Sequence, residues 1–134
     1  MSKTILIVEA PFYKDLTDAL VDGAITAIEM AGFTFERVDV PGVLEIPTAI
    51  NYAAASDRNY QGYVALGVVI RGETTHYETV CNDSSRALQL MGLQGICIGN
   101  GILTVENREQ AEVRADPARM NNGAGAAAAA LHLV

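Results

Sequence analysis

Residues 62–80 read GYVALGVVIRGETTHYETV. The first half, 63–70, is a short apolar run bounded by glycines, which predicts a strand buried on both faces, as in a parallel sheet. From Thr75 onward, apolar residues recur at the spacing of a helix. The stretch therefore predicts a strand, a turn over 71–76 and a helix. Such a turn lies at the carboxyl end of its strand, where open α/β sheets bind their ligands.

His76 falls in the first turn of this predicted helix. Unpaired amides at a helix N-terminus attract anions, and histidine exchanges protons near neutral pH. An isolated histidine more often packs or caps than reacts, but the anion-binding turn around it reverses that balance. We therefore expect His76 to transfer protons beside a bound anion.

Two motifs in this chain resemble nucleotide-binding loops without completing them. Gly67 and Gly72 have the spacing of a phosphate-binding loop, but Glu73 takes the position of its lysine, which argues against hydrolysis of nucleoside triphosphates. Residues 99–104 begin like a dinucleotide fingerprint but lack its third glycine. We interpret that second stretch as a turn.

Composition limits the classes of protein and partner. The 134 residues are 50% apolar and 19% charged, which predicts one folded domain over 1–134. The net charge of −7 argues against nucleic acid and anionic membranes as partners. No apolar run approaches the roughly 20 residues of a membrane span. The N-terminal apolar run is too short for a signal peptide, which favours the cytoplasm.

The two cysteines, Cys81 and Cys97, have no spacing typical of metal ligands. We expect them to be reduced, small core residues, and we expect no metal site.

Strand and helix patterns alternate along the rest of the chain. Strands are predicted over 4–8, 33–40, 63–70 and 96–98, and helices over 15–31, from 46, from 75, over 106–115 and over 124–134. Four strand–helix units in a row predict a flavodoxin-like, three-layer α/β/α sandwich with a four-stranded parallel sheet. The loops 12–13, 42–45, 71–76 and 100–104 then converge at one edge of the sheet, where we place the site.

Some candidate residues have two interpretations on local evidence. Phe12 is either a stacking platform or a core residue, and Glu45 either binds ligand or caps a helix. Arg114 ends a helix, where a cation is favoured by the helix dipole alone. The alanine-rich stretch 124–134 is apolar nearly all round and needs burial, in part against another copy of the chain.

Taken together, these motifs resemble the 6,7-dimethyl-8-ribityllumazine synthase family over essentially the whole chain. The segments that carry the resemblance are VPGVLEIP (40–47), ALGVVIRGETTHY (65–77), GILT (101–104), EQA (109–111) and RA (114–115). The resemblance implies an enzyme of riboflavin biosynthesis that uses no metal or cofactor. Its substrates would be 5-amino-6-(D-ribitylamino)uracil and 3,4-dihydroxy-2-butanone 4-phosphate, which it condenses with release of phosphate and water.

The resemblance also implies roles by position. It makes His76 the proton-transfer residue and Phe12 the aromatic that stacks on the pyrimidine. It assigns the remaining contacts to the uracil edge (backbone of Val69 and Ile70), the ribityl chain (Val43, Leu44 and Glu45) and the phosphate (Glu73, Thr74 and Arg114).

Three positions depart from the family pattern. Residues 10–13 read APFY where the family often has Arg-Phe-Asn. Asn100 replaces an aromatic that closes the pyrimidine site from a neighbouring subunit, and Asn122 replaces a lysine that contacts phosphate; Arg119 is a nearby candidate substitute for that lysine.

We interpret the chain as an active enzyme that forms at least a pentamer, with each site completed by a neighbouring chain. The few residues before the first strand favour an open pentamer. The alternative is a paralogue that binds a flavin or lumazine without catalysis, which the changes at Asn100 and Asn122 favour.

Overall fold

β3 (Gly62–Ile70) lies inside a parallel sheet, as its uninterrupted apolar sequence predicts. The strand order is β2-β1-β3-β4, with β1 spanning Thr4–Ala10, β2 Thr34–Asp39 and β4 Ile98–Val105. All neighbouring strands run parallel. This computed structural model describes residues 3–134; Met1 and Ser2, where the expected single domain begins, lie outside the described residues.

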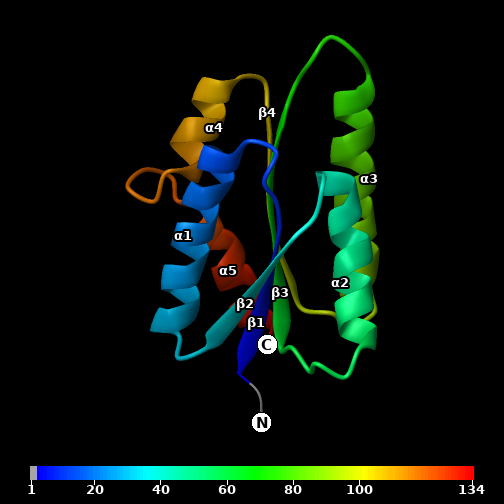
Figure 1. Cartoon of the computed structure of the whole chain (residues 1–134), viewed down its shortest axis with the longest axis vertical. Helices are drawn as coiled ribbons and strands as arrows, with labels where there is room; N and C mark the ends of the chain where they lie inside the picture. The colour runs from blue at the N-terminus through cyan, green and yellow to red at the C-terminus, as the bar shows by residue number, and fades with distance from the viewer. Residues whose placement is uncertain (1–2) are drawn as a thin grey trace.

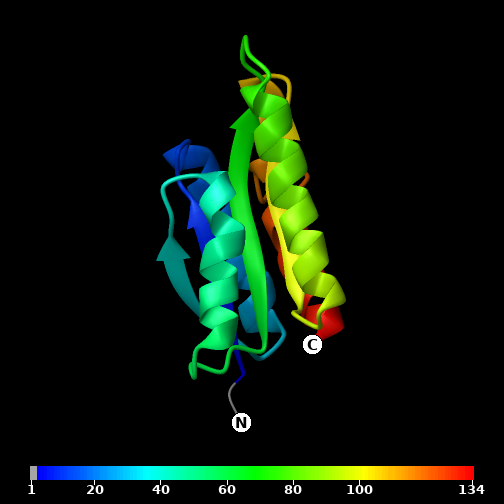
Figure 2. The same cartoon turned by 90° about the vertical axis from the view of Figure 1, so that its right-hand side faces the viewer.

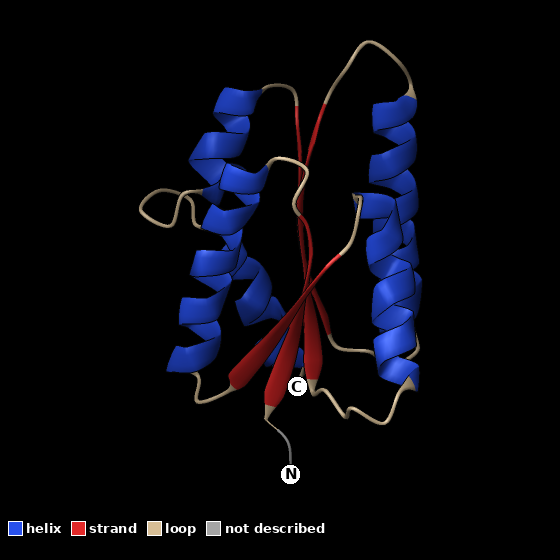
Figure 3. Cartoon of the chain, in the orientation of Figure 1, coloured by secondary structure: helices blue, strands red, loops and turns tan. Residues whose placement is uncertain are grey.

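Helices cover both faces of the sheet, which Figure 1 shows edge-on. One face carries α1 (Lys14–Met30), α4 (Arg108–Ala115) and α5 (Asn122–Leu133). The other carries the 3-10 turn η1 (Val43–Glu45), α2 (Ile46–Ala55) and α3 (His76–Leu93). Figure 2 views the molecule from the side of α2 and α3, which lie alongside each other over the strands. Figure 3 shows the three layers by element type.

The predicted three-layer α/β/α sandwich with a four-stranded parallel sheet is thus confirmed. Two apolar clusters hold the layers together, one on each face of the sheet. The first joins β1 and β3 to α1 through residues such as Ile7, Leu20 and Val64, and the second joins them to α2 and α3 through Val8, Ile50 and Leu88. None of the helices within residues 3–134 combines the length and apolar character that a membrane span requires.

The prediction for the fourth strand was wrong. It placed the strand at 96–98 and a turn over 99–104, whereas β4 runs from Ile98 to Val105. The glycines that indicated a turn instead face α5, because a Cβ at Gly99 would lie 1.8 Å from the carbonyl oxygen of Ala126. Glycine here permits close helix–sheet packing rather than a turn. The expected loop 100–104 at the carboxyl edge therefore does not exist.

α5 is buried on one side within the chain itself. Gly123, Ala126, Ala127 and Ala130 pack against α1 and the sheet, whereas Gly125, Ala128 and Ala129 on the opposite side are exposed. Its small residues suit this close approach, since a Cβ at Gly123 would lie 2.0 Å from the carbonyl oxygen of Leu20.

The two cysteines differ from their prediction as core residues. Both are free thiols, as expected, but each is only half buried. The Cys97 thiol donates a weak hydrogen bond to the carbonyl oxygen of Leu133, 3.5 Å away, near the C-terminal end of α5.

Candidate active site

A crevice forms where the chain leaves β1 and β3 on opposite faces of the sheet. These strands are neighbours, but β1 leads to α1 on one face and β3 leads to α3 on the other. Parallel sheets open at such a switch point, outside the carboxyl ends of the strands. A cavity of about 470 Å³ lies there. Seven of the predicted site residues line it: Phe12, Val43, Leu44, Glu45, Val69, Ile70 and His76.

His76 is the first residue of α3 and is exposed at the cavity. Its backbone N–H donates to Oγ1 of Thr74, 3.2 Å away, so the turn and the helix start are joined by a hydrogen bond. Thr75, at the N-cap position, makes no capping hydrogen bond with its side chain. An imidazole on the first helical turn therefore faces the space in which a ligand would lie.

Phe12 is an exposed platform and not a core residue. Its side chain is 77% exposed, and its ring meets Tyr13 edge-on at a centroid distance of 5.0 Å. Phe12 also borders a second, shallower hollow of about 420 Å³, next to Asp39 and Pro41. A large exposed aromatic beside a cavity is suited to stacking on a planar ligand.

The turn η1 forms one wall of the cavity. Its first residue, Val43, is buried against the sheet, whereas Leu44 and Glu45 are exposed. Glu45 occupies the N-cap position of α2, but its side chain makes no capping hydrogen bond. The structure thus leaves this carboxylate free to face the cavity, which it lines.

The end of β3 offers backbone groups to the cavity. Its pairing with β1 stops at Ala10 and Gly67, whereas its pairing with β4 continues to Ile70 and Val105. The last residues of β3 therefore extend past β1, and one side of their backbone has no neighbouring strand. Backbone N–H and C=O groups exposed in this way can recognise the polar edge of a planar ring.

The remaining predicted site residues lie outside this cavity. Glu73 and Thr74 are exposed in the loop between β3 and α3 and do not line it. Asn100 lies within β4, paired with Ala65 and distant from the carboxyl edge, so its expected place in a converging loop was wrong. The Oδ1 atom of Asn100 instead accepts a hydrogen bond from the N–H of Ile102, 3.0 Å away.

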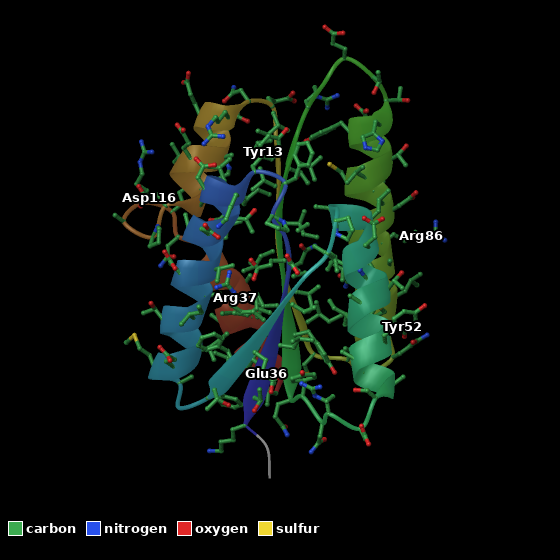
Figure 4. All side chains as sticks on the ribbon, in the orientation of Figure 1. Tyr13, Glu36, Arg37, Tyr52, Arg86 and Asp116 are labelled. Atoms are coloured by element: carbon green, nitrogen blue, oxygen red, sulfur yellow. The ribbon has the colours of Figure 1, made fainter. Side chains whose placement is uncertain are left out.

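Arg114 lies on the opposite face of the sheet from His76. It sits in the last turn of α4, where its Nη1 donates to the carbonyl oxygen of Gln110, 3.1 Å away. Figure 4 shows that the helices which carry the two residues, α4 and α3, lie on opposite sides of the molecule, with Asp116 just beyond α4 and Arg86 on α3. Within one chain, Arg114 and the cavity therefore do not meet.

Sequence reasoning missed several residues that complete the cavity. Ala10, Val68 and Val80 were absent from the predicted site, whereas Tyr13 and Gly42 were expected there only as members of the converging loops 12–13 and 42–45. Helix spacing could have indicated Val80, which follows His76 by one turn and so shares its face. The contact between Tyr13 and Phe12 brings the next aromatic of the same loop to the cavity.

The cavity wall carries little charge. Its lining residues include one carboxylate, Glu45, and one imidazole, His76, but no lysine or arginine. Burial raises the pKa of the nearby Cys81 thiol, which keeps it protonated and a poor nucleophile. Among residues 3–134, His, Cys, Asp and Glu side chains form no group of three that could hold a metal ion.

The profile of the 6,7-dimethyl-8-ribityllumazine synthase family matches residues 2–134. The chain belongs to this family. It is 54% identical to the 6,7-dimethyl-8-ribityllumazine synthase of Jannaschia sp. over 130 residues, which cover 97% of this chain and 72% of that relative. It is 55% identical to the synthase of Sphingopyxis alaskensis over 130 residues, covering 97% and 92% of the two chains. For the Zymomonas mobilis synthase the identity is 56% over 126 residues, covering 94% and 90%.

Membership of the lumazine synthase family extends over the whole described fold. The match includes all the elements that form the cavity, from β1 to α3, and also α4 and α5 on the other face. The resemblance inferred from the motifs is therefore confirmed, and the family is one of transferase enzymes.

Proposed function

We propose that this chain condenses 5-amino-6-(D-ribitylamino)uracil with 3,4-dihydroxy-2-butanone 4-phosphate to form 6,7-dimethyl-8-ribityllumazine, releasing phosphate and water. One observation carries the proposal beyond family membership. Seven residues expected at the site, contributed by three separated segments of the chain, line one cavity at the switch point of the sheet. That cavity combines an aromatic platform, free backbone groups and a single histidine, which are the groups this reaction needs.

The uracil ring would bind between Phe12 and the end of β3. Phe12 supplies a face for stacking, and the unpaired side of the β3 backbone near Val69 and Ile70 supplies hydrogen bonds to the polar ring edge. The ribityl chain would then extend along Val43, Leu44 and Glu45, since these residues form the adjoining wall.

His76 would move the protons of the condensation. The amino group of the uracil substrate attacks the ketone and forms an imine with loss of water. Phosphate then leaves, and the second amine closes the ring with loss of a further water. Each step transfers protons near neutral pH, where an imidazole both accepts and donates them. His76 lies at the cavity on an exposed helix terminus, so its ring can reach a substrate bound there.

Much of the rate acceleration would come from positioning. Holding two small molecules in register replaces a bimolecular step with an effectively unimolecular one. This explains why a site with a single imidazole and one carboxylate can suffice, without the paired catalytic groups that hydrolases use.

The phosphate-binding part would be completed by a neighbouring chain in an assembly of at least a pentamer. The cavity wall holds no lysine or arginine, yet a phosphate ester in a chain of net charge −7 needs local cations. Arg114 lies away from the cavity of its own chain, where it is available to the phosphate in the cavity of another. Asn100, which also lies away from its own cavity, would border the pyrimidine part of a neighbouring cavity. The exposed loop with Glu73 and Thr74 would hold the phosphate from the chain that provides His76. The cytoplasmic location expected from the sequence stays a prediction.

A direct assay tests the proposal. The two substrates are mixed with the pure protein, and formation of the lumazine chromophore is followed by absorbance, with a protein-free mixture as the control. Chromophore formation above the protein-free rate supports the enzyme. Tight binding of lumazine or flavin without any chromophore formation would instead support the non-catalytic paralogue, which the asparagines at 100 and 122 favour.

A further inference from the structure

One side-chain cluster beside the cavity has no role in the function proposed above. Arg71 follows directly after β3, and its guanidinium contacts three side chains. Nε donates to Glu106 at 2.7 Å, Nη1 pairs with Glu78, and Cζ lies 4.4 Å from the centroid of the Tyr77 ring. The backbone N–H of Arg71 also donates to the carbonyl oxygen of Val105, 2.9 Å away.

These contacts join three elements at the carboxyl edge of the sheet. Tyr77 and Glu78 belong to the first turn of α3, directly after His76, and Glu106 follows directly after β4. Arg71 thus ties the start of α3 to the ends of β3 and β4. The side chain of Thr75 makes no capping bond at this helix start, and the side chain of Thr74 accepts one from the N–H of His76, 3.2 Å away.

The contacts of Arg71 distinguish it from a phosphate ligand. Two carboxylates already accept hydrogen bonds from its Nε and Nη1 atoms, so the cluster of Arg71, Glu78 and Glu106 carries more negative than positive charge. Hydrogen bonding to Arg71 lowers the pKa of Glu78, and the same bond raises the pKa of Arg71. Glu78 and Arg71 therefore stay charged and paired at neutral pH.

We propose that Arg71 is a positioning residue that fixes His76 at the cavity by clamping the first turn of α3 through Glu78 and Glu106. This inference rests on the proposed function, because it assumes that His76 acts in the condensation. Two carboxylates and an aromatic ring hold the planar guanidinium in one orientation. Because Tyr77 and Glu78 belong to the first turn of α3, these contacts also fix the position of that turn. Displacement of a catalytic group by about 1 Å can reduce the rate about 100-fold.

Two variants separate clamping from phosphate binding. Arg71→Gln removes both the clamp and the charge, whereas Glu78→Gln breaks the clamp and leaves the Arg71 charge less neutralised. We expect each variant to lower kcat at least about tenfold, with the KM of both substrates within about threefold of wild type. Arg58→Gln is the matched control, because it breaks an exposed arginine–glutamate pair, with Glu36, at the other end of the sheet. It should keep wild-type kcat.

Hydrogen–deuterium exchange supplies a second readout that needs no activity. The N–H of Thr79 donates to the carbonyl oxygen of Thr75, so its protection reports the first turn of α3. Both clamp variants should exchange faster over residues 76–82 than wild type, and Arg58→Gln should not. If the wild-type protein shows no condensation activity, the proposed function is overturned. The exchange measurement would still decide whether the clamp exists.

Specific results would overturn the inference. If Glu78→Gln keeps wild-type kcat and lowers the KM of the butanone phosphate, then Arg71 is a phosphate contact and not a clamp. If Arg58→Gln loses as much kcat as Arg71→Gln, the effect is general destabilisation. Unchanged exchange over 76–82 in both clamp variants would also show that the first turn of α3 does not depend on Arg71.

Discussion

A Cβ atom at Gly67 would lie 2.9 Å from Cγ2 of Val43. Gly67 is on β3, and Val43 begins the turn η1, which forms a wall of the cavity. Contacts this short do not occur between ordinary side chains, so η1 can lie directly on β3 only because position 67 has no side chain. The size of the side of the cavity that we propose for the ribityl chain therefore depends on a glycine that does not line it.

Replacing this glycine should alter substrate binding. Gly67→Ala is expected to push Val43 outward, because the added methyl group needs the space that Val43 fills. Overpacking of this kind costs about 1–3 kcal/mol of the free energy of unfolding. We expect the KM of the ribitylaminouracil to rise about tenfold, with a smaller effect on the butanone phosphate. Steady-state kinetics with each substrate varied in turn, together with urea unfolding, measures both effects.

Gly92→Ala provides the control for Gly67→Ala. Gly92 lies in α3, and a Cβ there would meet no atom within 4 Å. Alanine is favoured over glycine in a helix, so stability should be unchanged or slightly higher and both KM values should stay at wild type. A wild-type KM for the uracil in Gly67→Ala would show that η1 does not define the ribityl side.

His76→Ala should lower turnover about 10- to 1000-fold while product binding stays nearly intact. Activity should not vanish, because the substrates are still positioned after the imidazole is removed. The test compares kcat with lumazine affinity in the same variant. Because His76 is exposed, the alanine variant should unfold at the wild-type urea concentration, which excludes misfolding as the cause. Wild-type turnover in this variant would remove His76 from the mechanism.

The sequence predicted β1, β2 and β3 to within about two residues but misplaced β4. β3 and the start of the helix after it were predicted to within a residue, because an apolar run bounded by glycines and followed by a helical repeat is a strong local pattern. β4 was misjudged because Gly99 and Gly101 are read locally as turn residues. Their actual role, contact with α5, depends on a helix more than twenty residues later in the chain. Local patterns cannot contain that information.

The site shows the same limit. His76, Phe12 and the 43–45 segment were predictable because they follow the ends of strands, which meet at one edge in a parallel sheet. Arg114 was assigned through resemblance alone, whereas Asn100 was also expected in a converging loop that is in fact part of β4. Within one chain the fold keeps both residues away from the cavity. Residues brought together by assembly leave no periodicity in the sequence, so no pattern in a single chain predicts their contacts.

The carboxyl of Glu36 accepts hydrogen bonds from Tyr60 and Arg58, and these bonds predict a pH dependence of stability. Hydrogen bonds from Tyr60, at 2.6 Å, and from Arg58, at 2.9 Å, lower the pKa of the Glu36 carboxyl below its usual 4.5. A carboxyl with a lowered pKa in the folded state stabilises the protein above its unfolded pKa, and this contribution is lost as the pH falls through the folded pKa. Glu36→Gln should therefore be slightly less stable than wild type at neutral pH.

That difference should shrink at acid pH. Urea unfolding of wild type and Glu36→Gln at about pH 7 and about pH 3.5 measures the difference in their stability. The difference should be small, because the contacts of Glu36 are exposed to solvent. Glu29→Gln serves as the control, because Glu29 is exposed and makes no ion pair within residues 3–134. A gap between Glu36→Gln and wild type that widens toward acid pH would contradict the assignment.

The exposed side of α5 is expected to lie between subunits. Ala128 is exposed in the single chain and sits among small apolar residues, so Ala128→Glu should leave the chain folded. In an assembly the same carboxylate would be buried without a partner, which is strongly unfavourable. We expect Ala128→Glu to dissociate or weaken the oligomer, measured by light scattering, while Ala128→Ser stays assembled. A wild-type mass for Ala128→Glu would place α5 outside the interface.

The last prediction concerns the cations for the substrate phosphate. Arg114 and Asn122 lie at the two ends of the loop between α4 and α5. Among the described residues, the one hydrogen bond of the Arg114 guanidinium goes to the carbonyl oxygen of Gln110, which leaves its other donors available. Charge-assisted hydrogen bonds contribute about 1.5–3 kcal/mol each. Arg114→Ala should therefore raise the KM of the butanone phosphate more than about tenfold and leave that of the uracil nearly unchanged.

Asn122→Lys should have the opposite effect, because it adds a cation at the start of α5, where an anion is already favoured by the helix amides. We expect it to lower the KM of the butanone phosphate about tenfold. The KM of each substrate is measured in both variants, with each substrate varied in turn. Effects on the binding of the butanone phosphate can then be distinguished from effects on the binding of the uracil. If Arg114→Ala raises the KM of the uracil alone, the phosphate does not lie at Arg114. If Asn122→Lys changes neither constant, a cation is already present there, and Arg119, exposed in the same loop, is the residue to replace next.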